Sequence, residues 1–450
     1  MRAGKFVIYV LCCNFLSIGL VAYAETVAIV NVNVIPMTSE TVLQEKTVIV
    51  TDGKIASIGE VRQTPIPEDI HVVDGTDRYL IPGLSEMHGH VPGAGSDSLQ
   101  RVLNLYVVNG ITLVRGMLGQ PSHLRLRRQI LDGEVLGPRL FTSGPSFNGR
   151  SVNSPQQATQ MVIDQHALGY DFLKIHPGLD LQEFDAIAGM ANELGIPFAG
   201  HVPADVGVAH ALAAGIATID HLDGYMQTLV PAHEDPSGGF EGFFGVLLGE
   251  QADEDKIAGI VDATRLAGTW NVPTQSLFVH VVSGDDPIDM SVWPEMRYMP
   301  ERIVRQWINS KESVVGDSAY RLASANRAIR IRQLIIEKLQ QSGAGLLLGS
   351  DSPQIFNVPG FSIHRELLSL VDAGLSPYQA LLTGTVNPAR FFGRDDVAGT
   401  IEEGFDADLV LLDANPLQDI AATRRVHGVM LRGRWVSKRE IRQMLEALER

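Results

Sequence analysis

Residues 80–90 read Leu80-Ile81-Pro82-Gly83-Leu84-Ser85-Glu86-Met87-His88-Gly89-His90, and this stretch decides the fold prediction. Its apolar first half is typical of a buried strand. Successive side chains of a strand point to opposite faces, so His88 and His90 project to the same side at the carboxyl end. Two imidazoles placed in this way can bind one metal ion. A His-x-His pair is common, so the prediction depends on the residues that follow.

Four further residues of ligand type stand at or near the ends of other predicted strands: Lys174, His201, His221 and Asp351. Taken singly, His201 and His221 each read as an ordinary core histidine that closes an apolar strand. Taken together, ligand-type side chains at the carboxyl ends of several barrel strands converge on one point. The set therefore predicts a metal centre.

Strand-like and helix-like stretches alternate through the middle of the chain, which predicts an α/β fold with a TIM (β/α)8 barrel. Helices are expected at Pro155–Leu168 and Leu181–Leu194, with Ser376 capping a third that opens at Pro377. The eight barrel strands are expected at Leu84–His90, Ile111–Met117, Leu140–Gly144, Phe172–His176, Pro197–Val202, Thr218–Leu222, Asn271–Leu277 and Gly345–Asp351.

Both ends of the chain have a different, β-rich character. Short strands are expected between residues 25 and 82, where Asp52-Gly53 marks a tight hairpin, and strand-like stretches return between residues 396 and 450. We expect the two segments to pair as one small composite β-sandwich domain beside a barrel that spans residues 83–395.

Two connections in the barrel are much longer than ordinary ones, at about residues 223–269 and 279–344. They contain Gly238-Gly239-Phe240, Phe243-Phe244, Trp293 and a long helical run from Glu301 to Leu339. We interpret them as a lid or substrate wall at the mouth of the barrel. A surface insertion that serves oligomerisation is the alternative.

Residues 1–24 resemble a cleaved signal peptide, with Arg2 and Lys5 before an apolar stretch and Ala22-Tyr23-Ala24 as the cleavage site. A retained membrane anchor is the alternative, although the apolar part is short. Cleavage would remove both cysteines, Cys12 and Cys13. We therefore expect a secreted or periplasmic protein without disulfides and without stable membrane insertion.

The chain is acidic, with a formal net charge of −16 over 450 residues. An excess of negative charge repels phosphate backbones and anionic lipids. We therefore expect no nucleic-acid partner, and a small-molecule substrate is the expected ligand. A homo-oligomer stays open.

Lys174 lies among the apolar residues of its strand, where burial should lower the pKa of an unpaired ammonium. A neutral amine can add carbon dioxide and become a carbamate that bridges two metal ions. The alternative is a lysine paired with a carboxylate such as Asp171. Asp351 ends an apolar strand and can bind a metal and accept a proton from bound water; a helix N-cap is its alternative.

These motifs resemble the amidohydrolase superfamily, in its secreted branch similar to imidazolonepropionases and Xaa-Pro dipeptidases. The resemblance covers most of residues 25–436. It rests on residues 81–90, 110–115, 170–175, 199–202, 220–221, 349–351 and 399–410.

The resemblance implies two divalent metal ions. Nitrogen and oxygen ligands suit zinc, which we expect, but also cobalt, manganese or iron. In it His88, His90 and Asp351 hold one ion, His201 and His221 hold the other, and carboxylated Lys174 bridges them. Asp351 acts as general base and acid for hydroxide attack on the carbonyl carbon. Gly89 and Gly116 depart from residues common in the family, which leaves the shape of the pocket in doubt.

Three residues are candidates for substrate contacts. Tyr225 could donate a hydrogen bond to the carbonyl oxygen, with a packed loop tyrosine as the alternative. Arg115 could bind a substrate carboxylate, with an internal ion pair as the alternative. His176, two residues past Lys174, could line the pocket.

The sequence thus predicts a secreted metal-dependent hydrolase that cleaves a C–N bond, with dipeptides or N-acyl amino acids as candidate substrates. A cyclic amidase, lactonase or esterase of the same fold is an alternative. A metal- or solute-binding barrel without catalysis is a third, although the general base Asp351 is present.

Overall fold

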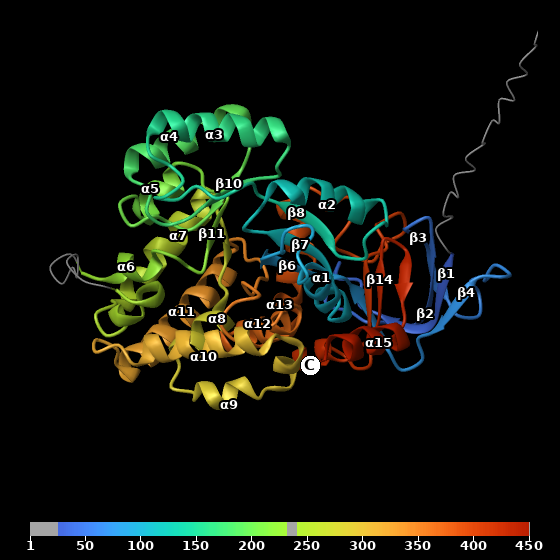
Figure 1. Cartoon of the computed structure of the whole chain (residues 1–450). Coiled ribbons are helices and arrows are strands. Elements are labelled where there is room, and N and C mark those ends of the chain that lie inside the picture. The colour runs from blue at the N-terminus through green and yellow to red at the C-terminus, as the bar shows by residue number, and fades with distance from the viewer. Residues whose placement is uncertain (1–25, 232–240, 450) are drawn as a thin grey trace, which may run out of the picture.

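The computed structural model describes residues 26–231 and 241–449 (Figure 1). The predicted signal peptide, residues 1–24, and the sequence Gly238-Gly239-Phe240 lie outside the described residues. In the described ranges no helix combines the length and hydropathy that a membrane span requires.

The barrel consists of two parallel sheets that join edge to edge. Ser143 bridges to Phe172 between the sheets on one side. On the other side, residues 345–352 lie between the outer strands, since the Leu347 N–H donates to Asn271 O and the Asp351 N–H donates to His88 O. The cylinder is thereby closed, which confirms the predicted fold class. The strands are β6 (Leu84–Gly89), β7 (Ile111–Gly116) and β8 (Arg139–Thr142) in one sheet, and β9 (Leu173–Ile175), β10 (Phe198–Gly200), β11 (Thr218–Asp220) and β12 (Trp270–Val272) in the other.

The seventh predicted strand, Asn271–Leu277, is wrong over its second half. Strand β12 ends at Val272, and helix α8 (Gln275–Val282) begins three residues later. The apolar side chains from Leu277 onward are buried on the helix, and a short apolar run does not distinguish a buried strand from a buried helix. Residues 345–351 complete the barrel through the hydrogen bonds above rather than as a regular strand.

Helices α3 (Pro155–Leu168) and α4 (Leu181–Leu194) have the bounds that the sequence predicts. Ser154 and Asp180 accept backbone N–H groups at their N-termini, and Ser376 does the same for α13 (Pro377–Gly384). The remaining helices of the barrel are α1 (Leu99–Val108), α2 (Pro121–Leu131), α5 (Gly207–Ala213), α7 (Ile257–Ala267), α12 (Phe361–Asp372) and α14 (Val386–Phe391).

The two ends of the chain pair in one eight-stranded sheet beside the barrel. The Ile55 N–H donates to Phe405 O, and the Gly404 N–H donates to Ile55 O, so the sheet folds over its own apolar core. Helix α15 (Lys438–Leu448) then packs on α1 of the barrel. The strands are β1 (Val27–Val34), β2 (Leu43–Thr51), β3 (Lys54–Glu60), β4 (His71–Asp74), β5 (Tyr79–Pro82), β13 (Leu409–Leu412), β14 (Val426–Leu431) and β15 (Arg434–Val436), with the short helix η5 (Ile420–Arg424) before β14.

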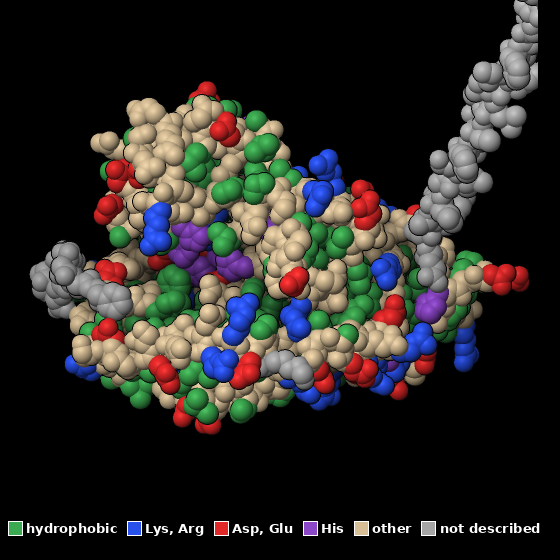
Figure 2. All heavy atoms as spheres, viewed as in Figure 1, with side chains coloured by type: hydrophobic (Ala, Val, Ile, Leu, Met, Phe, Trp, Pro, Cys, Tyr) green, Lys and Arg blue, Asp and Glu red, His purple; other side chains and the backbone are tan. Residues whose placement is uncertain are grey.

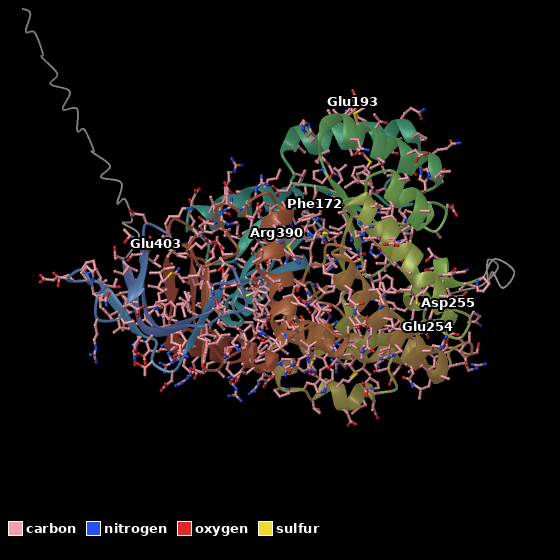
Figure 3. All side chains as sticks on the ribbon, turned by 180° about the vertical axis from the view of Figure 1, so that it is seen from behind. Phe172, Glu193, Glu254, Asp255, Arg390 and Glu403 are labelled. Carbon is pink, nitrogen blue, oxygen red and sulfur yellow. The ribbon has the colours of Figure 1, made fainter. Side chains whose placement is uncertain are left out.

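The first long connection forms the end of the molecule opposite this sheet, whereas part of the second lies beside α15, where Arg297 pairs with Glu449 at 3.3 Å (Figure 1). Seen from behind, Glu403 lies at the sheet end, Glu254 and Asp255 lie at the far end, and Phe172 lies between them (Figure 3). The connections contain α6 (Tyr225–Leu229), η2 (Phe243–Leu248), η3 (Glu254–Lys256), α9 (Pro287–Ser291), η4 (Pro294–Tyr298), α10 (Glu301–Val315) and α11 (Leu322–Ser342). The predicted single helical run from Glu301 to Leu339 is wrong, because residues 316–321 divide it into α10 and α11.

Candidate active site

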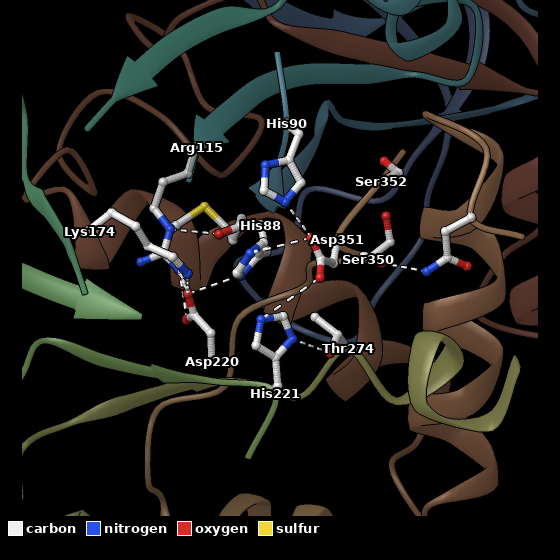
Figure 4. Close-up of polar contacts among 12 residues, drawn as sticks. His88, His90, Arg115, Lys174, Asp220, His221, Thr274, Ser350, Asp351 and Ser352 are labelled. Carbon is white, nitrogen blue, oxygen red and sulfur yellow. Dashed lines mark hydrogen bonds and ion pairs between the residues drawn. The ribbon is translucent and has the colours of Figure 1, made fainter. Parts of the chain in front are cut away.

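The carboxyl end of β6 brings two histidines to a carboxylate. Nε2 of His90 lies 2.6 Å from Oδ1 of Asp351, and Nε2 of His88 lies 3.5 Å from the same oxygen (Figure 4). Nε2 of His221 lies 3.8 Å from Oδ2 of Asp351. His88, His221 and Asp351 thus offer ligand atoms that all lie within 4.8 Å of one another, a spacing that suits one metal ion. The N-cap alternative for Asp351 is excluded, because the next helix, α12, begins at Phe361 with Gly360 as its N-cap.

His201 and His221 follow β10 and β11, which are paired neighbours in the barrel. Their ring centroids lie 4.8 Å apart, and the His221 ring lies 4.5 Å from the His88 ring. Each histidine also has a polar partner at Nδ1. This atom lies 3.0 Å from Asp223 in His201 and 2.8 Å from Thr274 in His221. Such partners fix the ring orientation and leave Nε2 to face a metal.

The amine of Lys174 is enclosed and makes no hydrogen bond to the described residues. Its Nζ lies 3.9 Å from Oδ2 of Asp220, and burial lowers its pKa to about 8. Asp171 is not its partner, since Asp171 is bound by Arg127 at 2.7 Å, and the carboxylate partner that the alternative expects is Asp220. A Cβ on Gly200 would come within 3.0 Å of the amine, so the glycine leaves room beside it.

Arg115 does not face the pocket, and its predicted substrate contact is wrong. The side chain is fully buried and donates to both carboxylate oxygens of Asp220, at 3.0 and 3.2 Å, and to Met87 O. Asp220 also lies 3.0 Å from Nδ1 of His88. Although burial opposes it, the charges of Arg115 and Lys174 hold the pKa of Asp220 below its ordinary value. Asp220 is thus an anion beneath the ligand set.

Tyr225 is also buried away from the pocket, so its predicted hydrogen bond to substrate is wrong. Its hydroxyl bonds to Thr264 at 2.8 Å, and burial raises its pKa to about 12. Tyr225 is therefore a packed tyrosine, as the alternative interpretation expects. His176 does line the pocket and stacks on His201 with ring centroids 5.1 Å apart.

A cavity of about 220 Å³ lies above the ligand set. Figure 2 shows histidine side chains at the bottom of a hollow in this face of the molecule. The lining residues are His88, His90, Leu118, His176, His201, His221, Phe243, Phe244, Leu277, Asp351, Gln354 and Ile355. Phe243 and Phe244 come from the first long connection, which agrees with the predicted wall; Trp293 lies elsewhere, in a cluster with Phe356 and Trp307.

Burial favours the neutral form of three histidines of the site. Burial lowers the pKa of His88 and of His221 well below the ordinary value, and it lowers the pKa of His176 to about 3. Neutral imidazoles, a carboxylate and an unbonded buried amine form a donor set that suits a divalent cation. The residues present therefore fit a metal centre.

The backbone is strained where the ligands leave their strands. His221 has φ 63° and Asp351 has φ 59°, in the left-handed region that non-glycine residues seldom adopt. Arg332 of α11 donates to the carbonyl oxygen of His221 at 2.5 Å and to Pro273 O at 2.8 Å. Strain of this kind persists only where surrounding contacts hold it, and it is concentrated at functional sites.

Sequence reasoning missed four supporting residues: Glu86, Asp220, Asp223 and Arg332. Glu86 accepts the N–H of His88 and the N–H of Ser350, both at 2.9 Å, and so ties the β6 end to the residues before Asp351. Burial raises the pKa of Glu86 to about 8. The sequence did offer an indication for two of them, because Glu86 lies two positions before His88 and Asp220 lies directly before His221. No sequence pattern indicated Arg332, whose partner His221 is distant in sequence. None indicated Asp223 either, because it contacts His201 from the segment after the next strand.

A closed barrel with this set at the carboxyl ends of its strands defines a metal-binding hydrolase site. Residues 79–436 match the model of the amidohydrolase family, and the chain belongs to that family. It is accordingly a hydrolase that acts on C–N bonds.

Curated relatives are distant but cover most of the chain. An imidazolonepropionase of Idiomarina loihiensis is 23% identical over 404 residues, which is 85% of this chain and 90% of that protein. An ochratoxinase of Aspergillus niger is 24% identical over 419 residues, which is 84% of this chain and 79% of that protein.

Solved structures agree on the fold. A bottromycin amidohydrolase superposes with a TM-score of 0.71 at 21% identity, over 94% of this chain and 89% of the other. A Xaa-Pro dipeptidase with bound methionine in its active site gives 0.64 at 19% identity, over 92% and 100%. At these identities the likeness establishes the fold alone.

Proposed function

We propose that this protein is a secreted, metal-dependent amidohydrolase that cleaves the amide bond of a small molecule such as a dipeptide or an N-acyl amino acid. The observation that carries the proposal is the convergence of four histidines, Asp351 and an enclosed, unbonded Lys174 amine at one end of the barrel. Burial of a lysine amine that makes no hydrogen bond and lies 3.9 Å from its nearest carboxylate is costly, and modification or neutralisation of the amine removes that cost.

In the proposed site His88, His90 and Asp351 hold one divalent ion, and His201 and His221 hold a second. Lys174, once carboxylated, would supply oxygen ligands to them, and zinc would suit the nitrogen and oxygen donors. Bound there, the ions supply Lewis acidity, which polarises the substrate carbonyl and lowers the pKa of water.

The chain's own residues do the rest. Asp351 lines the cavity, so one Oδ can accept a proton from the attacking water and return it to the leaving amine nitrogen. Asp223 and Thr274 orient the rings of His201 and His221, and Arg115 keeps Asp220 ionised beneath them. The apolar side chains around the mouth exclude bulk water, which strengthens electrostatic interactions inside.

The test combines metal analysis with a substrate panel. Purified protein should contain divalent metal by elemental analysis and should hydrolyse members of a panel of dipeptides and N-acyl amino acids. Asp351→Asn should lower kcat by about 10²- to 10⁴-fold, whereas Asp205→Asn, a change at an exposed carboxylate outside the pocket, should leave it unaltered. Full activity in Asp351→Asn would exclude the proposed proton transfer.

Secretion is a separate part of the proposal and rests on the signal-like residues 1–24. The mature protein from an expressing culture should begin at Glu25 and should be found outside the cytoplasm. An intact N-terminus on cytoplasmic protein would contradict it.

A further inference from the structure

The cavity above the histidines has both polar and apolar residues in its lining. Its polar lining consists of the histidines, Asp351 and Gln354, and neither lysine nor arginine is among the described residues that line it. The apolar lining consists of Leu118, Phe243, Phe244, Leu277 and Ile355, and Phe243 and Phe244 are in contact with each other. Apolar side chains facing a cavity favour an apolar group of the ligand.

Ring contacts hold Phe243 and Phe244 in place, although the backbone of Phe244 is strained. The ring of Phe244 stacks on His221 at 4.7 Å with an interplanar angle of 18°, and Phe243 packs edge-on against Phe244 at 4.4 Å. Phe244 has φ 46°, a left-handed conformation for a bulky residue. Strained backbone is concentrated at functional sites, and Phe244 lines the cavity.

The cavity is smaller than a pocket that encloses a whole drug-sized ligand, which is about 300–1,000 Å³. At about 220 Å³ it can hold the scissile bond and one side-chain-sized group. A second, open cavity of about 580 Å³ adjoins it and shares His176. The remainder of a substrate would extend there.

This second cavity carries a cation. Arg150 is exposed on its lining, and among the described residues its guanidinium has no ion pair or hydrogen-bond partner. An arginine fork recognises carboxylates in a bidentate manner.

We propose that the substrate carries a large apolar, preferably aromatic, group that packs against Phe243 and Phe244, and a carboxylate that binds Arg150 outside the cavity. This inference rests on the proposed amide hydrolysis and names its substrate class. Within it Phe243 and Arg150 are specificity-determining residues.

The apolar half is tested with matched N-acyl glycines. The metal-loaded enzyme should hydrolyse N-phenylacetylglycine with a kcat/KM at least about ten-fold above that of N-acetylglycine, as burial of a phenyl group predicts. Phe243→Ala should remove most of this preference. Leu247→Ala, in the same short helix but outside the cavity lining, should keep it.

The carboxylate half is tested by comparing N-phenylacetylglycine with its glycinamide. Arg150→Gln should raise KM for the carboxylate about ten-fold and leave KM for the carboxamide unaltered. Arg128→Gln, at another exposed arginine, should change neither. An equal effect of Arg150→Gln on both compounds would overturn the assignment.

Binding separates this inference from the proposed reaction. Calorimetric titration of the slow Asp351→Asn variant should give at least ten-fold tighter binding of N-phenylacetylglycine than of N-acetylglycine. That difference supports the substrate class even if wild-type turnover is absent, in which case the proposed function alone fails. Equal affinities, or amide hydrolysis with no aromatic preference, would overturn the inference while the function stands.

Discussion

The guanidinium of Arg115 and the carboxylate of Asp220 form a fully enclosed ion pair directly beneath the histidines of the site. The pair joins β7 to β11 across the barrel interior, and the same carboxylate contacts His88. It therefore links the barrel core to the ligand geometry.

Removing the arginine should leave the buried carboxylate of Asp220 without its closest cation, with Lys174 at 3.9 Å as the remaining one. We expect Arg115→Met to destabilise the protein by about 3–5 kcal/mol, because the desolvation cost of Asp220 is no longer offset. Urea unfolding at constant metal concentration measures this. Arg305→Met, which breaks the exposed Arg305–Glu301 pair, is the control and should cost less than about 0.5 kcal/mol. Similar losses in both variants would refute the structural role of the pair.

Asp223 should act on metal binding through His201, whose Nδ1 it contacts at 3.0 Å. Asp223→Asn should weaken metal affinity by about 10- to 100-fold, because the ring loses its anionic partner. A competition titration against a chromogenic chelator gives the affinity. Asp205→Asn should not alter it, and unchanged affinity in Asp223→Asn would remove Asp223 from the site.

Metal uptake should depend on carbon dioxide if Lys174 becomes a carbamate. Apoprotein in buffer depleted of carbon dioxide should bind less metal than the same protein with added bicarbonate, since the neutral amine needs carbon dioxide to become a ligand. Elemental analysis after desalting measures the difference. Lys174→Met should bind less metal under both conditions and show no bicarbonate effect. A bicarbonate effect that persists in Lys174→Met would place the carbamate elsewhere.

The buried His364 should make stability depend on pH. Burial lowers its pKa to about 3 from an ordinary 6.5, so between these values the unfolded chain binds a proton that the folded chain does not. Stability from this residue is therefore complete above pH 6.5 and is lost as the pH falls toward 3, by about 1.4 kcal/mol per pH unit.

His364→Gln should reduce that slope, measured by urea unfolding between pH 4.5 and 6.5 (a window of about two units). His280, with a similarly lowered pKa of about 3, keeps part of the slope in this variant. His71→Gln, at an exposed position, should leave the slope unaltered. An unchanged slope in His364→Gln would show that the histidine is solvated or paired in solution.

Local patterns predicted the parts of the fold whose causes are local. The sequence predicts that Ser376 caps the helix that opens at Pro377, and in the structure its side chain accepts the N–H of Gln379 at the start of α13. The strand predicted at Asn271–Leu277 is too long at its carboxyl end. The apolar residues there are buried in helix α8, and burial alone does not determine backbone geometry.

The sequence by itself determined the barrel and the set of ligand-type residues, because alternation along a strand and position at a strand end are properties of short segments. Only the tertiary structure decided where Arg115 and Tyr225 point, since both turn inward to Asp220 and Thr264, partners more than thirty residues away. It also brought Phe244 from a long connection over His221. Partners distant in sequence are chosen by packing and by satisfaction of buried polar groups in the closed fold, and no local pattern encodes that choice.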